Sequence, residues 1–185
     1  SVGDRIGAIL FNDSRTIEVK PSRSDRKVIS WLGGLTDMNR ELSASPGHSS
    51  NPGGLAEALR LVERSIDHDY LVGIVSDFYG WDDRALKIIR SISQHNDIIC
   101  TLVFDPLERD ISKASKLVVS DGQYQLEIEP ERQGLGQKFE ASFESSMAHV
   151  QGELRRHDIP VIPVDTVDNV TDQLREKLGG QRVLQ

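Results

Sequence analysis

The sequence predicts an α/β domain with a mainly parallel sheet and helices on both of its faces. Two apolar runs, residues 71–75 and 98–104, are continuous rather than alternating, as in strands that are covered on both sides. The amphipathic segment 84–95 lies between them, and this alternation is typical of parallel strands joined by crossover helices. The 185 residues suit a single domain, with bounds at 1–185.

The first element is predicted to be a β-hairpin. Residues 6–11 form a short apolar run, and residues 16–20 alternate between polar and apolar until Pro21 ends the pattern. The turn-forming residues 12–14 lie between the two runs. We therefore expect residues 16–20 to form the antiparallel edge strand of the sheet.

Two helices are predicted to follow. Ser22 and Asp25 resemble a capping box, and apolar residues recur at helical spacing after them, although Gly33 and Gly34 weaken this helix. The loop 43–54 is rich in Ser, Gly, Pro and Asn. Asn51 is expected to cap the next helix, with Pro52 in its first position. That helix has one apolar face, formed by Leu55, Ala58, Leu59, Val62 and Ile66.

The pattern changes after the strand at 98–104. Residues 116–129 are typical of an inserted hairpin with a tight turn at Asp121 and Gly122. A long helix follows, and we expect its apolar stripe to belong to the core rather than to a cofactor site. A last strand at 159–164 and a closing helix complete the domain. The stripe consists of Leu135, Phe139, Phe143, Met147, Val150 and Leu154.

Charge and cysteine content bound the partners and the compartment. The formal net charge of −7 argues against nucleic acid or an anionic membrane as the main partner. No apolar run reaches the roughly 18 residues of a spanning helix, so no membrane segment is predicted. Cys100 is the single cysteine and lies in an apolar strand, where we expect a buried, inert thiol. A reducing, cytoplasmic location is expected.

The candidate site lies where two strands end. Asp77 and Asp105 follow the runs 71–75 and 98–104, and ligands of open α/β sheets bind at the carboxyl ends of strands. We expect Asp77 at the end of a central strand, near the loop 43–54. Its role is open between function and capping of its own loop, whereas Asp105, which precedes Pro106, favours a role in a turn.

The segment after Asp77 is rich in aromatic and acidic residues. Phe78, Tyr79 and Trp81 are candidate contacts for a protein partner, or they pack under the loop. Asp82 and Asp83 lie where a helix begins, so we expect them to favour the helix dipole. The sequence lacks the nucleotide-binding glycine motifs and the serine-nucleophile motif, and its five histidines form no ligand-spaced pair, so we expect no enzyme.

Five segments, in order and spacing, resemble the bacterial domain-of-unknown-function-58 family. They are residues 3–11, 75–78, 104–110, 118–122 and 159–164. That family is similar to von Willebrand factor A domains, so the resemblance implies a Rossmann-like sheet with a metal-ion-dependent adhesion site at one end.

The resemblance also implies an incomplete metal site. Asp77 matches the family's aspartate after the fourth strand, but the Asp-x-Ser-x-Ser loop would precede Gly3, and no threonine stands among Pro52, Gly53 and Gly54. We therefore expect no tightly bound metal or other cofactor in this chain. In a full-length protein two alternatives stay open: a completed site that binds Mg²⁺, or a site that is degenerate there as well. The chain would be a von Willebrand factor A-like domain truncated at its N-terminus.

Two functions compete on these grounds. The first is a non-catalytic protein-binding module that works with a MoxR-type AAA+ ATPase, the partner class that the resemblance implies. The second is a Mg²⁺-dependent phosphoryl-transfer or receiver-like domain that uses Asp77 and Asp105; a purely structural domain is the third reading. The strand implied as missing would lie between residues 6–11 and 71–75, so we also expect copies of the chain to associate through an exposed sheet edge.

Overall fold

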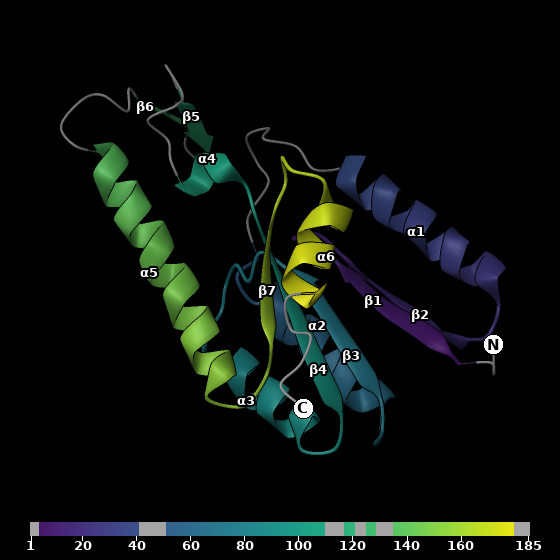
Figure 1. Ribbon diagram of the computed structural model, residues 1–185. Coiled ribbons are helices and arrows are strands. Elements are labelled where there is room, and N and C mark those ends of the chain that lie inside the picture. Colours follow the sequence, from purple (N-terminus) through teal and green to yellow (C-terminus); the bar gives the residue numbers. More distant parts are fainter. Residues whose placement is uncertain (1–3, 41–50, 110–116, 121–124, 129–134, 180–185) are drawn as a thin grey trace.

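The structure, a computed structural model, describes residues 4–40, 51–109, 117–120, 125–128 and 135–179 (Figure 1). Strands and helices alternate through most of this part of the chain. In chain order the elements are β1 (Ile6–Phe11), β2 (Thr16–Ser22), α1 (Asp25–Arg40), α2 (Gly54–Ser65), β3 (Leu71–Ser76), α3 (Asp83–Ser93), β4 (Asp97–Phe104), α4 (Pro106–Arg109), β5 (Leu117–Ser120), β6 (Gln125–Ile128), α5 (Leu135–Arg155), β7 (Val161–Asp165) and α6 (Val170–Gly179).

The main sheet is parallel and has the order β3-β4-β7. Cys100 in β4 pairs with Ile74 on one side and with Val161 on the other. This arrangement confirms an α/β fold with a parallel sheet. The expectation that Asp77 follows a central strand is wrong for the described residues, because β3 lies at the edge and β4 lies in the middle.

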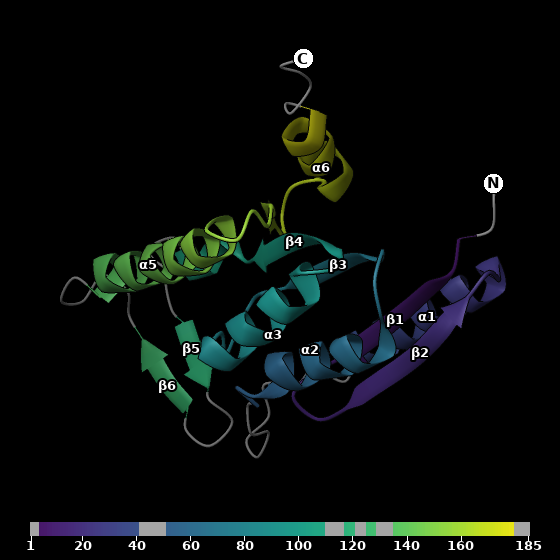
Figure 2. The ribbon, with the colours of Figure 1, turned by 90° about the horizontal axis from the view of Figure 1, so that it is seen from below.

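Helices lie on both sides of the main sheet. Figure 2 shows α2, α3 and α5 on one side and α6 on the other. The cover is uneven, because α6 packs against β7 and leaves the outer face of β3 open. Val72 and Ile74 of β3 are buried, but Leu71 and Val75 are exposed. The expectation that this strand is covered on both faces is therefore wrong, since a continuous apolar run does not reveal whether a second layer exists.

The first two strands form an antiparallel hairpin, as the alternation predicts, with Leu10 opposite Ile17. They make a separate two-stranded sheet rather than the edge of the main one, which corrects the expectation for residues 16–20. Helices α1 and α2 pack against β1. Within the described residues β1 pairs with β2 alone, so β1 and β3 do not close up on each other. Association of copies through this edge stays a prediction.

The core lies between the main sheet and the helices α2, α3 and α5. Its largest fully buried side chains come from α3, β4 and α5; they are Ile89, Cys100, Leu102 and Leu154. Burial raises the pKa of the Cys100 thiol to about 12, as an apolar environment disfavours the thiolate. The burial expected for Cys100 is thus confirmed.

The helix starts test the capping predictions. Helix α2 begins at Gly54 with Gly53 as its N-cap, so the assignments of Asn51 as cap and Pro52 as first residue are wrong. The Asn51 side chain accepts a hydrogen bond from the Gly53 N–H at 3.1 Å and thus closes the turn before the helix. Asp82 lies at the start of α3 as expected. It also caps this helix, since its side chain accepts hydrogen bonds from the N–H groups of Arg84 and Ala85.

The inserted hairpin is confirmed by the antiparallel pair β5 and β6, whereas its turn at residues 121–124 lies outside the described part. No helix among the described residues has both the length and the apolar character needed to cross a bilayer.

Candidate functional site

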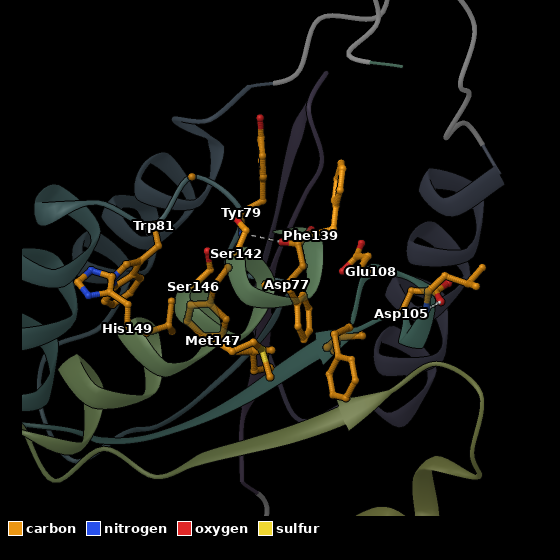
Figure 3. A pocket seen from close by; sticks show the side chains of 18 residues that line it. Asp77, Tyr79, Trp81, Asp105, Glu108, Phe139, Ser142, Ser146, Met147 and His149 are labelled. Carbon is orange, nitrogen blue, oxygen red and sulfur yellow. Dashed lines mark hydrogen bonds between the residues drawn. The ribbon is translucent and has the colours of Figure 1, made fainter. Parts of the chain in front are cut away.

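A groove of about 710 Å³ opens at the carboxyl ends of β3 and β4 (Figure 3). We call it the acidic groove; it is bounded by the loop 77–81, the end of β4 at 102–105, two residues of α4 and the α5 segment 139–150. Its position agrees with the rule that ligands of open α/β sheets bind beyond the carboxyl ends of the strands. Both predicted carboxylates, Asp77 and Asp105, line it.

Asp77 directly follows β3, so the expected placement at a strand's carboxyl end is confirmed. Its Oδ1 accepts hydrogen bonds from the Tyr79 N–H at 2.9 Å and from the Ser76 hydroxyl at 3.4 Å. Ser76 Oγ in turn accepts from the Phe78 N–H at 3.0 Å. Asp77 therefore caps its own loop while its carboxylate also lines the groove, and the two readings of this residue are compatible.

The loop after Asp77 is held in an unusual backbone conformation. Phe78 and Gly80 both have positive φ, at 57° and 74°. At Gly80 a Cβ atom would lie 2.0 Å from the Pro52 carbonyl oxygen, so only glycine allows this approach. The turn before α2, at the end of the loop 43–54, is thereby in contact with the segment that carries Asp77. Residues 43–50 lie outside the described part.

The positive φ of Phe78 turns neighbouring aromatic side chains in opposite directions. Phe78 is only 3% exposed and packs edge-to-face on Trp81, with ring centroids 5.8 Å apart. Phe78 is therefore a core residue, which corrects its assignment as a partner contact. Tyr79 is 56% exposed and its ring projects outward at the groove (Figure 3). Trp81 is half-buried and lies beside His149 at the far end from Asp105.

Asp105 and Glu108 form the other acidic part of the groove. Asp105 Oδ1 accepts from the Leu107 N–H at 2.8 Å and so caps the short helix α4, which confirms the expected role in a turn. Partial burial in the groove raises the pKa of Glu108, and the carboxylates of Asp77 and Asp105 raise it further. Glu108 was not identified from the sequence as a site residue. The feature that could have indicated it is its position three residues after Asp105, about one helical turn away.

The wall of the groove that comes from α5 combines four apolar side chains with those of Ser142, Ser146 and His149. Phe143 packs against Phe104 of β4, with ring centroids 5.7 Å apart. Met147 is half-buried beside it, and Phe139 is 38% exposed at the mouth. The apolar stripe of α5, which we expected in the core, is therefore buried only in part. Val150 and Leu154 are buried, but Phe139 is not, so the expectation is wrong for Phe139.

Among the described residues that line the groove, the side chains of lysine, arginine, aspartate and glutamate contribute charges of one sign. Three carboxylates line it, from Asp77, Asp105 and Glu108, and no lysine or arginine is found among the described lining residues. The nearby Arg109 pairs instead with Glu144, with Nε and Oε1 2.9 Å apart. The acidic side and the α5 wall line the same groove, and in the view of Figure 3 Phe139 is drawn between Asp77 and Glu108.

These residues do not by themselves fit a divalent metal ion. Mg²⁺ requires octahedral oxygen coordination, and the described residues contain no group of three His, Cys, Asp or Glu side chains that could hold a metal. Oδ1 of Asp77 is already engaged by its own loop. At the position where the resemblance implies a threonine, Gly53 and Gly54 supply no hydroxyl group.

The chain belongs to the family described as "Protein of unknown function DUF58", whose model matches residues 1–149. No curated protein matches the chain. A similar solved structure is the conserved hypothetical protein BatB from Bacteroides thetaiotaomicron. It is 9% identical, with a TM-score of 0.46, over 96% of this chain and 79% of that one. A likeness of this extent carries no argument about function.

Proposed function

We propose that the acidic groove is a protein-binding site and that this chain is a non-catalytic binding module. The observation that carries the proposal is the presence of large apolar side chains around one open groove. Tyr79, Leu107 and Phe139 all line it, and each keeps more than a third of its surface exposed. Tyrosine and phenylalanine are enriched at protein interfaces because one rigid ring buries a large area at low entropic cost.

Burial of these side chains by a partner would release a substantial free energy. Apolar surface removed from water contributes about 25 cal/mol per Å², and an aromatic side chain offers roughly 150–250 Å². Part of that gain offsets the lost motion of the two partners, so a few such anchors suit a reversible contact. From the family resemblance we propose a MoxR-type AAA+ ATPase as the partner class. From the same resemblance we propose a von Willebrand factor A-type topology for this chain.

The competing function uses Asp77 and Asp105 to hold Mg²⁺ for phosphoryl transfer. Both carboxylates line the groove, yet Oδ1 of each accepts a backbone N–H from its own turn. Those contacts support a capping role for the two aspartates and therefore favour the binding function. An enzyme of this class would also use a basic residue against the phosphoryl group, and none is found among the described lining residues.

Selection of a random displayed peptide library on the immobilised chain tests the proposal. The groove variant Leu107→Ser/Phe139→Ser removes two exposed apolar side chains, and the matched control Ile29→Ser/Val167→Ser removes two that lie elsewhere. We expect the selected peptides to bind the wild type and the control with equal affinity. On the groove variant their affinity should fall about tenfold or more, which corresponds to about 1.4 kcal/mol of binding free energy.

The thermal unfolding midpoint of each variant shows whether it is folded. Peptides that bind the folded groove variant as tightly as the wild type would contradict the proposal, and so would the absence of any selected peptide.

A further inference from the structure

We infer that the partner of the acidic groove is a basic, apolar peptide segment, in which a large apolar side chain enters against the α5 wall and a nearby lysine or arginine pairs with the carboxylates of Asp77 and Glu108. This inference rests on the proposed function and adds the chemistry of the partner. The observation behind it is that one groove is lined both by three carboxylates and by the apolar side chains of α5.

Charge complementarity selects the basic part of the segment. Asp77, Asp105 and Glu108 all lie at the same side of the groove, where Figure 3 shows Glu108 between the other two. No described lining residue is a lysine or arginine, so none of the described lining side chains carries a full positive charge to neutralise them. A carboxylate on the partner would be repelled there, whereas a guanidinium or ammonium group would gain charge-assisted hydrogen bonds. The net charge of −7 adds long-range attraction for the same partner.

The α5 wall selects the apolar part. Phe143 and Met147 present half-buried side chains to the groove, and Phe104 forms its floor on β4. A thioether and aromatic rings adapt to apolar side chains of different shapes, as at other peptide-binding surfaces. Because Phe139, Asp77 and Glu108 all line this one groove, a single peptide segment can contact the apolar and the acidic part together.

The proton affinity of Glu108 provides an independent readout. Partial burial, and then the carboxylates of Asp77 and Asp105, raise the pKa of this side chain. A bound cation favours the ionised carboxylate, so occupation of the groove by a basic segment should lower that pKa. Among the described residues, the other titratable groups near this region are the Arg109–Glu144 pair between α4 and α5, and Tyr79 and His149, which line the groove. A purely apolar ligand would deepen the burial and shift the pKa upward.

The test measures the affinity of short labelled peptides of equal length by fluorescence anisotropy. The first peptide combines leucine and lysine in a glycine–serine background, the second replaces lysine by glutamate, and the third replaces leucine by serine. We expect the leucine–lysine peptide to bind at least about tenfold more tightly than either of the others, a gap of about 1.4 kcal/mol. Its affinity should fall with added salt.

Matched variants separate the groove from the general acidity of the protein. Asp77→Asn/Glu108→Gln removes two groove charges while Asn retains the Oδ1 that caps the loop; Asp37→Asn/Glu176→Gln removes two charges on α1 and α6. We expect the first pair to weaken binding of the leucine–lysine peptide about tenfold or more and the second to change it less than about twofold. The Glu108 carboxyl carbon, followed by NMR, should titrate at lower pH in the complex.

Equal effects of the two double variants would overturn the inference, because binding would then reflect net charge alone. It would also be overturned if the leucine–glutamate peptide bound as tightly, or if no peptide bound. Where the library instead yields groove-dependent peptides that lack basic residues, the proposed function stands and only this inference fails. Where no groove-dependent peptide is found, both fail.

Discussion

The two halves of α5 carry one apolar stripe through two different environments. In the C-terminal half Val150 is buried and Leu154 is fully buried against the main sheet. In the N-terminal half Phe143 is half-buried and Phe139 lies exposed at the mouth of the acidic groove. Helical periodicity therefore marks the face that contacts something, but it does not say whether the chain itself supplies the cover.

The largest expected difference between the halves is in stability. Leu154→Ala should lower the free energy of unfolding by about 2–5 kcal/mol, because it removes a fully buried side chain and leaves a cavity. Phe139→Ala, in the same helix, should change it by less than about 1 kcal/mol. Urea denaturation of the three proteins measures both values, and equal losses would mean that the two halves of α5 are covered alike.

Phe143 lies between these extremes and sharpens the comparison. Phe143→Ala removes the ring contact with Phe104, but Phe143 is only half-buried. We therefore expect the free energy of unfolding to fall by about 1–3 kcal/mol. Phe143→Leu serves as the control, since it keeps most of the apolar contact. A loss as large as that of Leu154→Ala would extend the core to this end of the helix.

A smaller effect is expected from Glu108, on the acidic side of the groove. Its pKa in the folded chain is raised, so the folded state holds the proton more readily than the unfolded state does. Stability should therefore fall as the pH rises above the ordinary glutamate pKa of about 4.3, until the raised pKa is passed. Below the ordinary value both states are protonated and the contribution is fully present.

Denaturation of Glu108→Gln across this pH range measures the effect. The variant should lose this part of the pH dependence and should be more stable than the wild type at neutral pH, whereas Glu176→Gln on α6 should follow the wild type. A Glu108→Gln curve parallel to that of the wild type would show that the groove does not perturb this carboxyl group.

Local patterns were enough to predict most of the elements. The apolar runs predicted β3, β4 and β7, because strands of a parallel sheet are rich in apolar residues, although β3 is buried on one face only. Asp82 was predicted as a helix-start residue from its position alone. Asp77 and Asp105 were brought to one edge because parallel strands share the direction of their carboxyl ends.

The features that escaped prediction depend on contacts distant in sequence. Whether β1 and β2 join the main sheet is decided by strand pairing that no local pattern records. The inward turn of Phe78 depends on a positive φ that few non-glycine residues adopt. Glu108 lies in a four-residue helix, which is too short to show a periodicity.

The close approach of Gly80 to Pro52 has a mechanical consequence. It places the loop that carries Tyr79 directly against the turn before α2, and α2 itself packs against β1. With 2.0 Å between the Pro52 oxygen and the place of a Cβ atom, any residue but glycine would force these two turns apart. A side chain at position 80 would thus move Tyr79 and its loop away from the turn before α2, the helix that packs against β1.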